Sequence, residues 1–185
     1  MQAFRYRARR VCAVTLIRAA ILLLSTSAFA EDLWMPLREG WNRYTNERFG
    51  TVVEVPRHLF TLVEPPPVNG DGRELKAEDG ARLWIYGSYG PYVVTDSFQK
   101  YKSWLLEHAE LDRLTYKAEG KGWIVLSGTK QGSIVYRKVV EGCGAAHEVQ
   151  IEYPAQKKAL YDLLITRLSK SLGCSLGQPS VENLP

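Results

Sequence analysis

The sequence has few of the residue types that carry catalytic or metal chemistry. Its 185 residues include three cysteines and three histidines, and His58, His108 and His147 lie far apart in the chain. Ser88 lies in a Gly-Ser-Tyr-Gly stretch that lacks the G-x-S-x-G spacing of a nucleophile elbow. No catalytic residue and no cofactor are therefore predicted. A small secreted hydrolase would need a histidine site that only the fold assembles.

Basic clusters are also missing once the first thirty residues are set aside. The chain has 24 basic and 20 acidic residues, and residues 1–30 hold five of the basic ones and none of the acidic ones. Residues 31–185 therefore carry a formal net charge of −1. Nucleic-acid binders show a basic patch or stripe, which the isolated pairs Arg137-Lys138 and Lys157-Lys158 do not form. We exclude nucleic acid as a partner.

No apolar run is long enough to span a bilayer, and the N-terminus has the pattern of an export signal. A basic segment precedes the run AAILLLSTSAFA, which is shorter than the roughly 18–20 residues of a membrane helix. The run ends in Ala28-Phe29-Ala30, the small-x-small pattern of a signal-peptidase site. We predict a signal peptide over 1–30, cleaved after Ala30, and a periplasmic or secreted bacterial protein. Arg9-Arg10 leaves the general secretory and twin-arginine export routes both open.

Cleavage would leave two cysteines, Cys143 and Cys174, in a compartment where disulfides persist. A strand ending at Tyr153 leads outward from Cys143 for about 30 Å, at roughly 3.4 Å per residue. A helix from Pro154 to Gly173 returns about the same distance, at roughly 1.5 Å per residue. If that helix packs antiparallel on the strand, Cys174 arrives beside Cys143. We predict a disulfide between the two.

The periodicity of the remaining chain predicts an α+β fold. Alternation and turn residues indicate strands, and apolar residues at helical spacing indicate helices. The expected strands cover residues 51–56, 81–89, 113–119, 122–130, 132–141 and 147–153, and the expected helices cover 98–111 and 154–173. Short connections make adjacent strands antiparallel. We expect one domain over 31–175, with about six antiparallel strands, flanking helices and a long C-terminal helix packed on the sheet, and a flexible tail over 176–185.

Both helices have an apolar stripe that should face the core. The first stripe comprises Phe98, Tyr101, Trp104, Leu105, His108 and Leu111, and Asp96 or Ser97 can cap this helix. The second comprises Ala159, Leu160, Leu163, Leu164, Leu168 and Leu172.

One N-terminal stretch resembles a known family. It contains Tyr44-x-Asn46-x-x-Phe49-Gly50, then Val53-x-Val55-Pro56 and the aromatic Phe60. This pattern is similar to the N-terminal signature of PsbP-like domains, which include the extrinsic photosystem II subunit, a Ran-binding protein and bacterial envelope proteins. The resemblance implies an antiparallel sheet with flanking helices and a binding or assembly role, usually without catalysis. It transfers no ligand, because the partners of the family differ widely.

An aromatic run, Trp84-Ile-Tyr86-Gly-Ser-Tyr89-Gly-Pro-Tyr92, is the best binding candidate. Tyrosines on a segment with glycine and proline offer a large contact area with a polar end, a composition favoured at interfaces. We predict Tyr86, Tyr89 and Tyr92 as binding residues and expect Trp84 to lie in the core.

Two candidate metal sites have simpler interpretations. The acidic stretch at 69–79 fails as an EF-hand, because position 1 of the loop would be Pro67, which has no side-chain oxygen. Its weak calcium ligands would be Asn69, Asp71, Glu78 and Asp79, but tight turns at Asn69-Gly70 and Asp79-Gly80 explain them better. The two cysteines with His147 offer three zinc ligands and no fourth nearby. No metal is predicted.

The sequence therefore favours an exported, non-catalytic envelope domain that binds or supports an unidentified envelope protein. Two alternatives stay open: the hydrolase with a spatially assembled histidine site, and a calcium-dependent module at residues 69–78.

Overall fold

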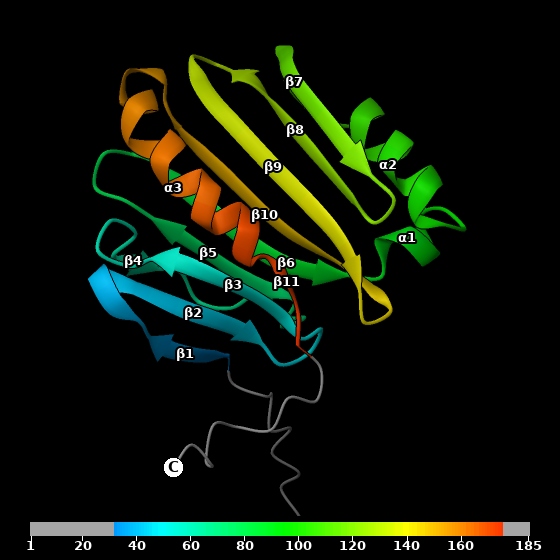
Figure 1. The fold of residues 1–185 in the computed structure, drawn as a ribbon, viewed down its shortest axis with the longest axis horizontal. Coiled ribbons are helices and arrows are strands. Elements are labelled where there is room, and N and C mark those ends of the chain that lie inside the picture. Colours follow the sequence, from blue (N-terminus) through cyan, green and yellow to red (C-terminus); the bar gives the residue numbers. More distant parts are fainter. Residues whose placement is uncertain (1–31, 176–185) are drawn as a thin grey trace, which may run out of the picture.

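The structure is a computed structural model that describes residues 32–175, so the predicted signal peptide and the tail over 176–185 lie outside the described residues. The described chain forms two antiparallel sheets and three α-helices (Figure 1). The small sheet has the order β1-β2-β3-β11, with β1 (Leu33–Pro36), β2 (Trp41–Asn46), β3 (Thr51–Pro56) and β11 (Gly173–Cys174).

The large sheet has the order β4-β5-β6-β10-β9-β8-β7. Its strands are β4 (Leu62–Val63), β5 (Gly72–Lys76), β6 (Arg82–Ser88), β7 (Arg113–Gly120), β8 (Trp123–Lys130), β9 (Ser133–Gly142) and β10 (Ala145–Pro154). The helices are α1 (Gly90–Val93), α2 (Phe98–Glu107) and α3 (Lys158–Ser171), with short 3₁₀ turns at Arg38–Gly40 and Ala155–Lys157.

The predicted α+β class, the antiparallel pairing and the C-terminal helix on the sheet are confirmed. The meander β7-β8-β9-β10 lies close to the predicted ranges, because each of its turns contains glycine and each strand is long. The prediction of about six strands in one sheet was wrong, since residues 32–175 contain eleven strands in two sheets. The missed strands have two to six residues, and in β2 the burial does not alternate, so no period of two was visible.

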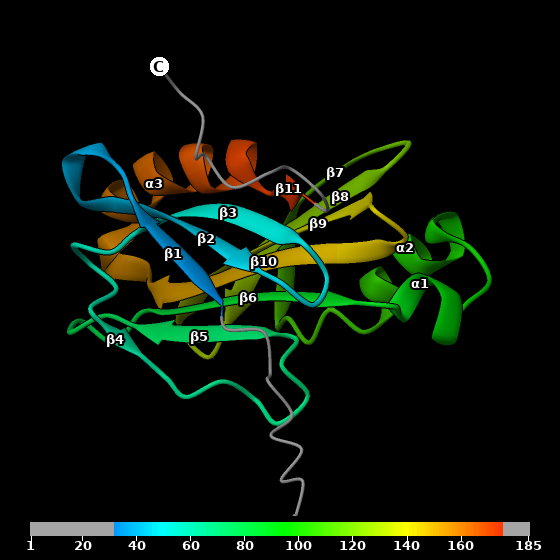
Figure 2. The same cartoon turned by 90° about the horizontal axis from the view of Figure 1, so that it is seen from below.

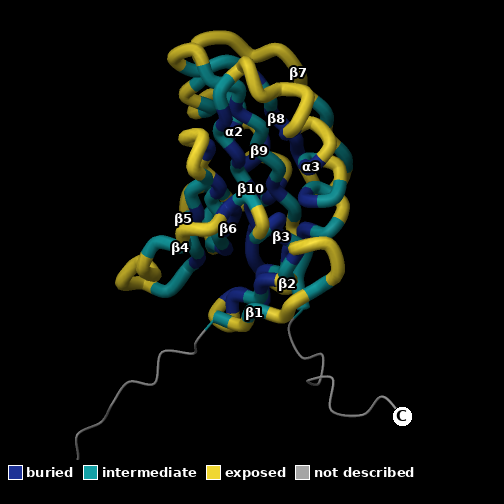
Figure 3. Tube along the Cα trace, turned by 90° about the vertical axis from the view of Figure 1, so that its left-hand side faces the viewer, coloured by how far each residue is buried: buried dark blue, intermediate teal, exposed yellow. Residues whose placement is uncertain are grey.

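The main core lies between the two sheets and α3. Both α3 and the small sheet pack on one face of the large sheet, which Figure 2 shows from below. Buried residues from all three layers meet there, including Val55 of β3, Ile151 of β10 and Leu168 of α3. On the other face, α2 packs against β8 and β9 through a second cluster. Figure 3 shows the buried positions in the centre of the molecule and the exposed edge strand β7.

The buried face of α3 differs from the predicted stripe. Leu164, Leu168 and Leu172 are buried as expected, but Leu160 and Leu163 are exposed, and Tyr161 takes their place. The Tyr161 ring stacks on Tyr153, and its hydroxyl donates to Asp79 at 2.9 Å. A buried tyrosine whose hydroxyl has an acceptor is a stable core residue. The helix is therefore rotated relative to the expected stripe, and Ala159 is exposed as well.

Of the two predicted caps, Asp96 and Ser97, the structure has Ser97 as the N-cap of α2. Its side chain accepts a hydrogen bond from the Lys100 amide. The helix ends at Glu107, so His108 lies at its C-terminus and is exposed, and Leu111 lies beyond it. Only the first part of the predicted stripe therefore faces the core.

The segment that resembles PsbP-like domains has a structural role. The Asn46 side chain accepts a hydrogen bond from the Phe49 amide at 3.0 Å and so closes the turn between β2 and β3. Gly50 has a φ of +68°, which glycine adopts without strain. Phe49 packs against Gly87 of β6, where a Cβ atom would lie 2.4 Å from the phenylalanine Cβ. The motif thereby joins the small sheet to the large one.

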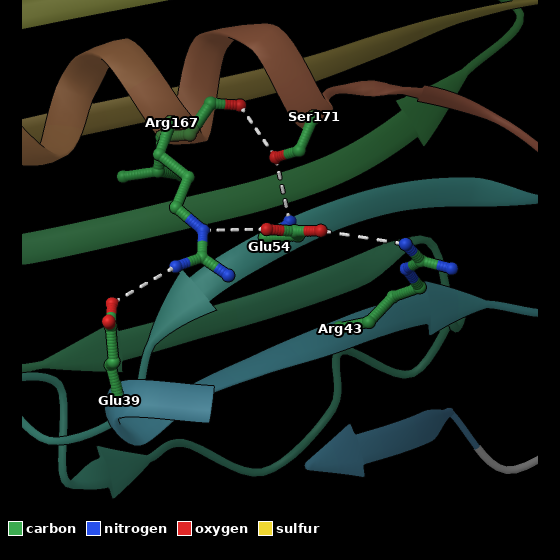
Figure 4. A network of polar contacts seen from close by, with 6 residues as sticks. Glu39, Arg43, Glu54, Arg167 and Ser171 are labelled. Carbon is green, nitrogen blue, oxygen red and sulfur yellow. Dashed lines mark hydrogen bonds and ion pairs between the residues drawn. The ribbon is translucent and has the colours of Figure 1, made fainter. Parts of the chain in front are cut away.

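A polar network attaches the outer side of the small sheet to α3 (Figure 4). The Glu54 carboxylate of β3 accepts from Arg167 Nε at 2.7 Å, and its backbone amide donates to Ser171 Oγ at 2.8 Å. The Arg167 guanidinium also lies over the Trp41 ring, 4.3 Å from its centroid. These contacts fix α3 relative to β3 at the rim of the core.

The predicted disulfide between Cys143 and Cys174 is present, with the two Cα atoms 6.2 Å apart. As the geometry required, α3 returns along β10, and the two-residue strand β11 brings Cys174 beside the β9–β10 turn.

Candidate functional site

The most conspicuous surface feature is a cluster of exposed apolar side chains at one end of the large sheet. Four side chains within six residues are largely exposed: Tyr89 by 51%, Tyr92 by 50%, Val93 by 80% and Val94 by 48%. We call this set the α1 surface. Single exposed apolar residues are common, but a cluster of them is typical of an interaction site.

The α1 surface is held by packing beneath it. Pro91 is buried, and Gly90 lies so close to Tyr101 of α2 that a Cβ atom would be 2.6 Å from the tyrosine oxygen. The Thr95 hydroxyl donates to the Pro91 carbonyl at 2.9 Å, which closes the turn after α1. The short helix is thus fixed to the fold although its outer side chains are in solvent.

The two exposed tyrosines are also oriented by neighbours. The Tyr89 ring lies edge-on to Phe49 with centroids 4.9 Å apart, and the Tyr92 hydroxyl donates to Glu141 at 3.3 Å. Because their rings are already ordered, little rotamer entropy remains to be lost when a partner binds. This pre-organisation favours recognition by the rings.

Tyr86, the third predicted binding residue, has a different environment. Its hydroxyl donates to Glu148 at 2.6 Å, and the same carboxylate accepts from Arg137 Nε at 2.6 Å and Nη2 at 2.8 Å. Glu148 is almost fully buried. Burial and the adjacent carboxylate raise the pKa of Tyr86 far above its ordinary value. The structure therefore uses the Tyr86 hydroxyl internally, and we do not include it in the α1 surface.

Trp84 was expected in the core, and this expectation was wrong. Leu83, Ile85 and Gly87 are the buried residues of β6, so the alternation places Trp84 on the opposite face of the strand, where it is half-buried. The Arg82 guanidinium covers its ring at 4.5 Å from the centroid. An indole can lie at a surface when a cation shields its face.

None of the three histidines forms a hydrolase-type site within residues 32–175. His58 and His108 are exposed, and their Nδ1 atoms lie 3.3 and 2.8 Å from the backbone oxygens of Gly40 and Trp104. His147 is fully buried, with Nδ1 2.8 Å from the Thr51 hydroxyl. No hydrogen bond joins these imidazoles to a serine or carboxylate in this part of the chain. The buried hydroxyl–imidazole pair has no access for a substrate.

The hydrogen bonds of His147 indicate where the proton of its neutral ring lies. Nε2 lies 2.9 Å from the Gly142 carbonyl, which can only accept, so Nε2 carries the proton and Nδ1 accepts from the Thr51 hydroxyl. Burial lowers the pKa of this imidazole, against the opposing effect of the Gly142 carbonyl. Burial thus favours the neutral form of His147, whose contacts link β3 to β10.

The weak calcium candidates are not brought together. Asn69 and Asp71 precede β5, and the Asn69 amide donates to Asp71 at 2.7 Å. Glu78 and Asp79 follow β5, whose five residues extend about 17 Å at the usual rise per residue. Asp79 accepts hydrogen bonds from the Ala81 amide and Tyr161. Among the described residues, no three His, Cys, Asp or Glu side chains are grouped as metal ligands.

Sequence reasoning found the two exposed tyrosines but missed Val93 and Val94. Two valines after an aromatic residue look like the start of a buried strand, so they carried no signal of exposure. The signal that was available is Gly90-Pro91 before them, which is typical of a short helical turn outside the sheet.

Within residues 32–175, no helix is both long and apolar enough to cross a membrane. No protein-family model and no curated protein matches the chain. The fold is similar to the solution structure of cyanobacterial PsbP (CyanoP) from Synechocystis sp. PCC 6803, at 11% sequence identity over 74% of this chain and 93% of that chain, with a TM-score of 0.49. A similarity at this level concerns the course of the chain and assigns no ligand, partner or functional residue.

Proposed function

We propose that this protein is an exported, non-catalytic domain that binds a protein partner of the bacterial envelope through the α1 surface. The observation that carries the proposal is the exposure of Tyr92 and Val93 on α1 and of Tyr89 and Val94 at its two ends, on a segment that is itself packed against α2. A rigid cluster of aromatic and aliphatic side chains is the composition expected at the centre of a protein interface.

Three further observations bear on this proposal. The Cys143–Cys174 disulfide agrees with an oxidising compartment outside the cytosol. The histidines, which a small hydrolase would need, are engaged with backbone oxygens or buried with Thr51. The structure gives the calcium alternative no group of ligands within residues 32–175.

Site-specific photo-crosslinking tests the proposal. The photoreactive residue p-benzoyl-phenylalanine replaces Val93 in one variant and Leu163 in a matched control. Leu163 is 77% exposed on α3, so the two positions have nearly equal access to solvent and differ in surface. After irradiation of native envelope, the Val93 variant is expected to give one discrete crosslinked partner that the Leu163 variant does not give.

A mutational arm tests the same surface without a crosslinker. Because interface tyrosines often contribute more than about 1 kcal/mol each, the double variant Tyr89→Ala/Tyr92→Ala is expected to weaken capture of that partner at least about tenfold. Capture that is unchanged in this variant would refute the assignment of the partner to the α1 surface.

A further inference from the structure

A groove lies between α3 and the outer strands of the large sheet. Two hollows of about 380 and 470 Å³ adjoin there, since Tyr116 and Tyr136 line both of them. The floor is the face of β7, β8 and β9 beside α3, and Figure 1 shows these strands uncovered next to the helix. This groove involves other elements than the α1 surface.

The smaller hollow has the composition of a small-molecule site. It is lined mainly by aromatic and aliphatic side chains: Tyr116, Ala118, Trp123, Val125, Tyr136 and Val140. Trp123 and Tyr116 are exposed, so their rings are available to a ligand. Ligand sites of about 300–1,000 Å³ are usually apolar, with a small number of polar groups that orient the ligand.

Lys138 is the charged group in this hollow. Its Nζ donates to the Ser169 carbonyl at 2.6 Å. An ammonium has three donors, and no carboxylate of residues 32–175 forms an ion pair with this one. Burial lowers the pKa of Lys138, which is the effect of a cation without a neighbouring anion.

We propose that the groove binds a small organic anion with an apolar body. Its anionic group would accept hydrogen bonds from Lys138 Nζ, which are strong because both partners are charged. Its body would lie against the exposed rings of Trp123 and Tyr116 and over Val125 on the floor. The hollow thus offers a contact for each half of an amphiphilic ligand: an uncompensated cation for the anionic group and an aromatic surface for the apolar body.

Two related fluorescent probes test the charge requirement. The anionic probe 8-anilinonaphthalene-1-sulfonate and the neutral N-phenyl-1-naphthylamine share an aromatic body and differ in the sulfonate. Each is titrated into the purified protein and into Lys138→Met. Lys170→Met is the matched control, because Lys170 lies in the hollow on the other side of α3, beside Glu54.

The proposal predicts that Lys138→Met weakens binding of the anionic probe about tenfold, which is the usual effect of losing one hydrogen bond to a charged group. The neutral probe should bind Lys138→Met as it binds the wild type, and Lys170→Met should bind both probes like the wild type. Lys138→Arg should retain the preference for the anion, which separates loss of charge from loss of folding. Tyr116→Ala should weaken both probes. Equal affinity of wild type and Lys138→Met for the anionic probe would overturn the proposal, as would a neutral probe that binds the wild type as tightly as the anionic one.

Discussion

The buried pair of Arg137 and Glu148 makes a sharp test of how the large sheet is stabilised. The two residues join β9 to β10 by two hydrogen bonds, and Glu148 also accepts from Tyr86 of β6. Glu148→Gln removes the negative charge and leaves Arg137 buried without a counter-ion. We expect the free energy of unfolding to fall by about 3 kcal/mol, the lower end of the range for breaking a buried pair, because glutamine still accepts from the tyrosine.

Urea denaturation followed by far-UV circular dichroism measures this change, with an unchanged slope m as the sign that only stability has altered. The melting temperature should fall by about 10 °C for a domain of this size. The double variant Arg137→Met/Glu148→Gln contains no unpaired charge, so we expect it to be more stable than Glu148→Gln alone.

The exposed pair of Arg82 and Glu74, with a 2.7 Å contact, is the matched control. Glu74→Gln should cost no more than about 1 kcal/mol, because solvent already screens this pair. The account of the buried pair would be wrong if Glu148→Gln cost as little stability as Glu74→Gln. It would also be wrong if the double variant lost as much stability as the single variants Arg137→Met and Glu148→Gln lose together.

Three further predictions follow from the packing. Gly87→Ala should cost about 1–3 kcal/mol of stability in urea denaturation, since its Cβ would lie 2.4 Å from the Cβ of Phe49. The control Gly173→Ala, whose Cβ would have no atom within 4 Å, should cost much less. Equal costs would contradict the close approach of the two sheets. Reduction of the Cys143–Cys174 bond, whose cysteines are 31 residues apart in the sequence, should lower stability by about 3–4 kcal/mol without changing the fold. A thiol assay on unfolded, unreduced protein that comprises residues 31–185 should detect no free cysteine. Because burial lowers the pKa of His147 in the folded state, the unfolded chain takes up a proton at higher pH than the folded one. Stability should therefore fall as the pH drops below about 6.5. In His147→Gln this dependence of stability on pH should be lost, and an unchanged dependence would show that other groups cause it.

The sequence predicted those parts of the fold that depend on local signals. The β9–β10 hairpin and α3 could be predicted because alternation, glycine turns and helical spacing are properties of neighbouring residues. The disulfide followed from them, since the rise per residue of a strand and a helix fixed where Cys174 would arrive. The pairing of β6 with β10, in which Tyr86 lies opposite Glu148, joins residues far apart in the chain and has no local signal.

The candidate site was predicted in part for the same reason. Tyr89 and Tyr92 could be proposed as exposed because they follow glycines in a segment with proline. Tyr86 could not be separated from them, because its acceptor Glu148 and the neighbouring Arg137 come from other strands. The groove beside α3 was invisible to sequence reasoning, since Lys138 and Trp123 become neighbours only through the register of β8 and β9.

Photo-crosslinking at Val93 against Leu163 in native envelope tests the central claim most directly, and it is best performed with and without a chelator. The account predicts one discrete partner from Val93 in both conditions and none from Leu163. No partner from Val93, or the same products from both positions, would contradict partner binding through the α1 surface. A partner lost on chelation would instead show that a metal is required, against the metal-independent interface proposed for this end of the sheet.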